Sequence, residues 1–114
     1  MNASVLLDQA EQILRGTSPN RNRMACWIAR SALEDVVRSR LIQQGQPTGA
    51  ASMRSALTCL EVATPDEPSV AQRAEYAWSG LSSSCHHHAY ELTPTATEAE
   101  RLIGVVRGLL SSPR

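Results

Sequence analysis

Apolar residues recur every three or four positions along most of the chain, and glycine or proline interrupts this pattern at intervals. Such spacing places side chains on one face of an α-helix, whereas strict alternation would indicate strands. The pattern predicts helices over residues 2–15, 20–44, 50–63, 69–88 or slightly beyond, and from 95 onwards. We therefore expect an all-α fold, a bundle of four or five helices that forms one domain over residues 1–114.

Several predicted helices carry one apolar face that we expect to point into the core. These faces are Val5, Leu6, Gln9, Ile13 and Leu14 in the first helix, Ala71, Ala74, Trp78, Leu81 and Cys85 in the fourth, and Leu102, Ile103, Val106, Leu109 and Leu110 in the fifth. Thr95 is followed three residues later by Glu98, which matches a capping box and predicts the start of the fifth helix.

The predicted helix over residues 20–44 differs because it has apolar side chains on two sides. Ala25, Ile28, Ala29, Ala32, Leu33 and Val36 share one face, and Trp27, Val37 and Leu41 lie nearly opposite. A two-faced helix is typical of the centre of a bundle or of a contact with a second subunit. The same reasoning makes Trp27 and Trp78 core or interface anchors, with base stacking as the alternative.

The charges balance over the whole chain, with 11 basic residues, all arginine, against 11 acidic ones. Neutrality argues against strong non-specific binding to nucleic acid. Residues 15–54, however, hold seven arginines and only Glu34 and Asp35, a local net charge of +5. Arg23, Arg30 and Arg38 lie beside Trp27 on one side of the second helix. We expect either a solvated face, with Glu34 paired to Arg30 or Arg38, or contacts to RNA phosphates.

The cysteines indicate a reducing compartment. Cys26, Cys59 and Cys85 lie among apolar neighbours and have no CxxC spacing, so we expect buried free thiols. The N-terminal residues lack the pattern of a signal peptide, and no apolar run approaches the ~20 residues that span a bilayer. We therefore expect a cytoplasmic protein that does not enter membranes and needs no metal or other cofactor.

All three histidines lie side by side in SSSCHHHAYEL, residues 82–92. In a helix, His86, His87 and His88 would point about 100° apart, so they could not bind one metal ion together. Histidines also suit the C-terminal end of a helix. A third interpretation is acid–base catalysis, in which His86 and Tyr90 move protons during phosphodiester cleavage while Arg73 or the basic second helix holds the phosphate.

Three segments together resemble the HEPN superfamily: Leu6-Leu7-Asp8-Gln9-Ala10, Ala29-Arg30-Ser31-Ala32-Leu33-Glu34, and the stretch from Trp78 to Tyr90. The resemblance implies a small, often dimeric helical bundle of bacterial toxin–antitoxin and defence systems. Many members are ribonucleases whose motif is an arginine followed four to six residues later by a histidine.

This chain departs from that motif, because residues 79–83 contain no arginine and Arg73 lies thirteen residues before His86. Only the histidine half matches, on His86, His87 or His88, with Tyr90 at the place of an aromatic that often follows. The resemblance therefore implies a non-enzymatic module that binds a cognate protein or RNA as a homodimer. The alternative is a metal-independent endoribonuclease that uses one of these histidines.

Overall fold

Five α-helices account for most of the residues that the computed structural model describes, which are 2–46, 52–85 and 94–111. They are α1 (Ala3–Arg15), α2 (Arg21–Gln43), α3 (Met53–Ala63), α4 (Pro68–Cys85) and α5 (Ala96–Ser111), and the described residues contain no strand. The predicted all-α bundle is confirmed, and the predicted helix boundaries that fall on described residues agree to within a few residues. The start predicted at residue 50 and the end predicted at residue 88 or beyond lie outside the described residues. None of these helices is long and apolar enough to cross a bilayer.

Local side-chain signals explain where several helices begin and end. The side chains of Asn2, Ser52 and Thr95 accept hydrogen bonds from backbone N–H groups three residues later, at 2.9, 3.2 and 3.0 Å, and so cap α1, α3 and α5. At the end of α2, Gly45 adopts a positive φ of 74° and the Gln46 N–H donates to the Leu41 carbonyl at 2.8 Å. This is a Schellman motif, in which glycine tolerates the left-handed backbone.

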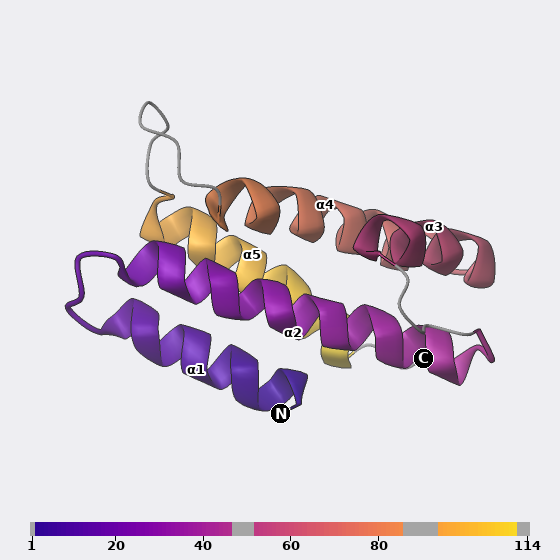
Figure 1. The fold of residues 1–114 in the computed structure, drawn as a ribbon, viewed down its shortest axis with the longest axis horizontal. Helices are drawn as coiled ribbons and strands as arrows, with labels where there is room; N and C mark the ends of the chain where they lie inside the picture. Colours follow the sequence, from indigo (N-terminus) through magenta and orange to yellow (C-terminus); the bar gives the residue numbers. More distant parts are fainter. Residues whose placement is uncertain (1, 47–51, 86–93, 112–114) are drawn as a thin grey trace.

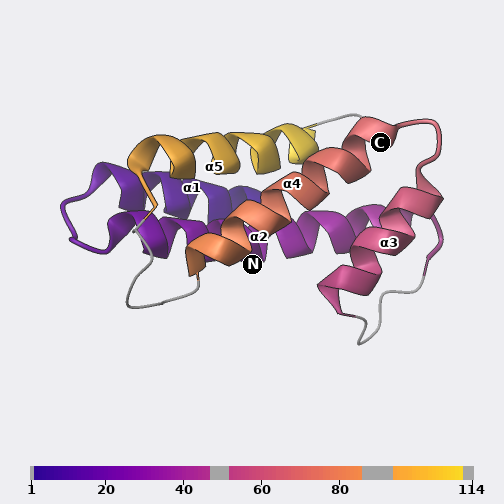
Figure 2. The ribbon, with the colours of Figure 1, turned by 90° about the horizontal axis from the view of Figure 1, so that it is seen from above.

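Helix α2 lies at the centre of the bundle and packs against all four other helices (Figure 1). Helices α1 and α5 lie along its first part and α3 lies at its far end, while α4 crosses it obliquely from beside α3 back towards its first turn (Figures 1 and 2). Helix α3 contacts only α2 and α4 among the described helices. The central position predicted for a two-faced helix is therefore confirmed.

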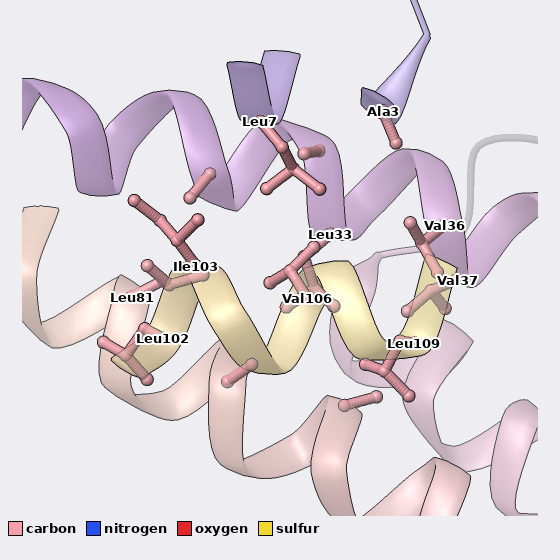
Figure 3. Packing of buried hydrophobic residues seen from close by; sticks show 14 of the residues in the cluster. Ala3, Leu7, Leu33, Val36, Val37, Leu81, Leu102, Ile103, Val106 and Leu109 are labelled. Atoms are coloured by element: carbon pink, nitrogen blue, oxygen red, sulfur yellow. The ribbon is translucent and has the colours of Figure 1, made fainter. Parts of the chain in front are cut away.

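The core is aliphatic and continuous along the bundle (Figure 3). Leu33 of α2, Leu81 of α4 and Ile103 and Val106 of α5 are almost completely buried. The large side chain that α1 buries fully is Leu7, because the axis of its inward face runs through Ala3, Leu7 and Ala10. The face predicted for α1 was wrong in its centre: Val5 is exposed, and Leu6, Gln9, Ile13 and Leu14 are only partly buried.

Two further predicted faces were corrected at their edges. In α4 the buried residues are Val70, Ala74, Ala77 and Leu81, whereas Ala71, Trp78 and Cys85 are half-buried at the side. In α5, Ala99 replaces Leu110 on the buried face, and Leu110 is partly exposed. In α4 the exchanged pairs, Val70 with Ala71 and Ala77 with Trp78, differ in direction by about 100°, so a rotation of roughly half that angle about the helix axis is enough to exchange them.

Polar contacts fix the helices against each other at the outer ends of the core. Arg107 of α5 donates to Asp8 and Glu11 of α1, both at 2.9 Å. The backbone N–H of Ala3, which is unpaired within α1, donates to the Asp35 carboxylate of α2 at 3.1 Å. A carboxylate at a helix N-terminus is also favoured by the helix dipole. Both contacts set the position of α1 along α2 and α5.

Gly80 marks a close approach of α4 to Leu102 of α5. A Cβ atom at this position would lie 2.8 Å from Cδ2 of the buried Leu102, whereas a Cβ at Gly104 of α5 would meet nothing within 4 Å. We expect Gly104→Ala to raise the free energy of unfolding by roughly 0.5–1 kcal/mol through helix propensity. Gly80→Ala forces Leu102 to move, so it should be less stable than Gly104→Ala by about 1–3 kcal/mol. Urea denaturation measures both, and equal stabilities would contradict the close packing.

Candidate functional site

The predicted catalytic residues His86, His87, His88 and Tyr90 lie outside the described residues. The described residues on either side of them are held by adjacent side chains of α2. Arg23 Nη1 donates to the Ser84 carbonyl at 3.3 Å, near the end of α4. Asn22 Nδ2 donates to the carbonyl of the buried Pro94 at 3.0 Å, just before α5. The first turn of α2 therefore fixes both points at which the histidine segment joins the bundle.

Arg30 lies about two turns after Arg23 on α2, and its side chain covers the side of α4. Its guanidinium carbon is 4.4 Å from the centre of the Trp78 ring, a cation–π contact. Its guanidinium also lies near enough to the thiol of Cys85, the residue before His86, to oppose the rise that burial causes in the pKa of that thiol. Its Nε is buried and has no hydrogen-bond partner within the described residues. Arg23 and Arg30 thus place two guanidinium groups beside the last turn of α4.

The cysteines at this end of the bundle are poor nucleophiles. Burial raises the pKa of Cys26 to about 11, although a hydrogen bond with the Ser84 side chain opposes this rise. Burial also raises the pKa of the half-buried Cys85, against the effect of Arg30. Both groups remain neutral thiols near pH 7, and thiolates are the reactive form. The expectation of buried cysteines holds for Cys26 but was wrong for Cys59, which is exposed on α3.

The four arginines predicted to bind RNA or phosphate do not form one cluster. Arg23 and Arg38 are 15 residues apart on α2, or about 22 Å along the helix axis. Arg38 pairs with Glu34 at 3.5 Å, which confirms one of the two expected pairings. Arg73 donates through Nε to the Ser69 carbonyl at 3.4 Å and lies beside Gly108 near the end of α5. Of the four, only Arg23 and Arg30 are brought together, beside the last two turns of α4.

The outward side of α2 carries a line of exposed apolar side chains, which we call the α2 outer face. Trp27 is 66% exposed, Ile42 63% and Met24 43%. Met24 and Ile42 are 18 residues apart, which is five full helical turns, so they have the same direction. The prediction that Trp27 is buried in the core was wrong, and its alternative as an interface anchor stays a prediction. Val37 and Leu41, expected on the side of Trp27, are buried.

The pattern analysis missed the α2 outer face because the apolar residues on it are few and far apart. Met24 and Ile42 lie at opposite ends of the helix, with polar residues between them. Their five-turn separation is a signal that a search limited to spacings of three and four does not find. Asn22 was also missed, since an asparagine in the first turn of a helix usually indicates only a local cap.

Within the described residues, no three histidine, cysteine or acidic side chains lie close enough together to hold a metal ion. Comparisons of the chain with protein-family models, with curated proteins and with solved structures find no match.

Proposed function

We propose that this chain is a non-enzymatic, HEPN-like helical module that binds protein or RNA in the cytoplasm, within a toxin–antitoxin or defence setting. The observation that supports this proposal best is the α2 outer face. Trp27 is two-thirds exposed, and Met24 one turn before it is also exposed, so the two offer an apolar surface to a partner near the start of α2. Tryptophan is also the residue type most enriched at the energetic centre of protein interfaces.

The α2 outer face suits a second copy of the chain, and so a homodimer. Two α2 helices can pack antiparallel through their outer faces, with the two-fold axis crossing α2 at the level of Leu33, midway between Met24 and Ile42. Met24 of one copy then lies beside Ile42 of the other. The same arrangement brings Trp27 of one copy close to Arg38 of the other, where a cation–π contact can form. The small Ser31, near the middle of this face, allows the helices to approach closely.

The homodimer predicts about twice the monomer mass in light scattering. Replacing Trp27 by glutamate should weaken association at least about tenfold, since an interface tryptophan commonly contributes 2 kcal/mol or more. The matched control is Val62→Glu, at a site that is 74% exposed on α3 and away from this face. A monomeric native protein, or equal association of both variants, would contradict the homodimer.

RNA binding finds support in the first part of α2, near the last turn of α4. Trp27 offers an exposed ring on which an unpaired base can stack. Arg23 lies one turn before Trp27 on α2, and Arg30 lies one turn after it. Guanidinium groups on either side of an aromatic ring are suited to phosphates that flank a stacked base.

One observation favours the alternative, a metal-independent endoribonuclease that uses His86, His87 or His88. The sequence lacks an arginine in residues 79–83, yet Arg23 and Arg30 of α2 contact Ser84 and Cys85 directly before the first histidine. A cation from α2 would serve the phosphate where the motif arginine is absent. Histidine is the side chain that enzymes use most often for general acid–base catalysis.

Incubation with total RNA separates the two functions. We expect no cleavage by the purified chain or by the variant His86→Ala/His87→Ala/His88→Ala, while both retain binding to a labelled single-stranded RNA. Cleavage that the triple variant loses would favour the endoribonuclease, and its loss in Arg23→Ala would assign the cation. The control is Arg15→Ala, an exposed arginine at the end of α1. Absence of RNA binding in all forms would leave a protein partner for the module.

A further inference from the structure

We propose that a groove between α3 and α4 binds an amphipathic helix of a partner protein with lysine or arginine beside its apolar face. This inference rests on the proposed function as a binding module and adds the surface and the chemistry of the partner. The groove has a volume of about 730 Å³. Helix α3 and the first part of α4, which line it, lie at the end of the bundle away from the last turn of α4 (Figure 2). Its α3 wall runs from Arg54 to Thr64, about 15 Å.

The floor of the groove is apolar. Leu57 of α3, Pro65 of the connecting loop, and Pro68 and Ala71 of α4 line it. Thr64, which also lines it, has its hydroxyl occupied, because Oγ1 donates to the Leu60 carbonyl at 2.7 Å. The groove therefore offers mostly carbon surface to a ligand, which favours an apolar face on the occupant.

The rim of the groove is polar and carries unbalanced negative charge. At one end Arg54 and Glu75 form an ion pair across the groove, with Nη1 and Oε1 2.7 Å apart. Glu61 on the α3 wall, and Asp66 in the loop beside it, form no ion pair within the described residues. An occupant with basic residues at the edge of its apolar face would neutralise these carboxylates.

The dimensions favour a helix as the occupant. A wall of about 15 Å corresponds to roughly three helical turns, the length that amphipathic helices use when they dock through residues i, i+4 and i+7. Helix α3 contacts only α2 and α4 among the described helices, so no described helix covers this side. The half-exposed Tyr76 at the α4 wall provides an aromatic anchor of the kind common at such interfaces.

Two synthetic peptides test the proposal on the full chain. Both peptides have about 15 residues, roughly four helical turns, with leucines on one face. The remaining positions are lysines in the first peptide and glutamates in the second. We expect the leucine–lysine peptide to shift the amide NMR signals of Leu57, Glu61 and Ala71, and to bind at least about tenfold more tightly than the leucine–glutamate peptide. Ala71→Arg, which fills the floor, should weaken its binding about tenfold, and the surface variant Glu61→Gln about threefold.

Trp27→Ala on the α2 outer face is the matched control and should leave peptide binding unchanged. The proposal is overturned if the leucine–glutamate peptide binds as tightly, if Glu61→Gln and folded Ala71→Arg bind like the native chain, or if the shifts map to α2. If the peptide test fails but Trp27→Glu still disrupts a dimer, only the groove proposal is wrong and the proposed binding module stands. If the peptide test fails and the native chain is also a monomer, the proposed binding module is contradicted as well.

Discussion

Replacing Leu33 by alanine is expected to lower the free energy of unfolding by about 3–5 kcal/mol, the largest effect of any single core substitution proposed for this protein. Leu33 is fully buried in the middle of α2, the helix that contacts all four others (Figure 3). Its removal leaves a cavity between helices that are fixed by many further contacts. The surrounding side chains therefore cannot collapse into the space, and the cost includes both lost burial and the cavity.

Urea denaturation followed by circular dichroism measures this loss, with Val62→Ala as the control. Val62 is an apolar β-branched residue on α3 that points to solvent. Its replacement should change stability by less than about 0.5 kcal/mol. A loss for Leu33→Ala close to that of the control would contradict the central position of α2.

Replacing Arg40 by methionine should lower the free energy of unfolding by about 2–3 kcal/mol, since it leaves a buried carbonyl without its charged donor. Arg40 is one of the two buried polar or charged residues among those described. Its Nη2 donates at 2.7 Å to the carbonyl of Leu109, in the last turn of α5, where the helix itself provides no donor. Burial lowers the pKa of Arg40, which still leaves an arginine charged at neutral pH.

Methionine keeps much of the volume of Arg40, so the expected loss reports the hydrogen bond and not a cavity. The control is Arg15→Met, which removes an exposed arginine from the last turn of α1 and should cost less than about 0.5 kcal/mol. Protection of the Leu109–Ser111 amides from hydrogen exchange gives a second measurement, because α5 should fray in the Arg40 variant. Equal stability of the two variants would show that the contact contributes little.

The two proposed surfaces do not overlap, which allows them to be occupied together. The α2 outer face follows the outside of the central helix, whereas the groove lies between α3 and α4. A homodimer formed through α2 would therefore present two grooves, one on each copy. Arg23 and Asn22 contact Ser84 in the last turn of α4 and Pro94, whereas the groove lies between α3 and the first part of α4, so the proposed RNA and protein partners would bind at separate places.

The candidate site could be predicted only in part. The i,i+4 pair of Glu34 and Arg38 follows from spacing alone, and the structure confirms it at 3.5 Å. The contacts of Asn22 with Pro94 and of Arg23 with Ser84 join residues 72 and 61 positions apart in the chain. No local pattern indicates such pairs, because they depend on how α2 lies across the ends of α4 and α5.

What the sequence determined by itself is the set of helices. Their limits follow from signals within one turn, such as Thr95 capping the Glu98 N–H and Gly45 ending α2, and such contacts are the same in any fold. The tertiary structure decided which sides of those helices meet. Leu6 and Leu7 are adjacent and equally apolar, yet only Leu7 is fully buried, and Trp27 faces solvent. Burial depends on the angle at which neighbouring helices pack, and that angle is set by side chains distant in the chain.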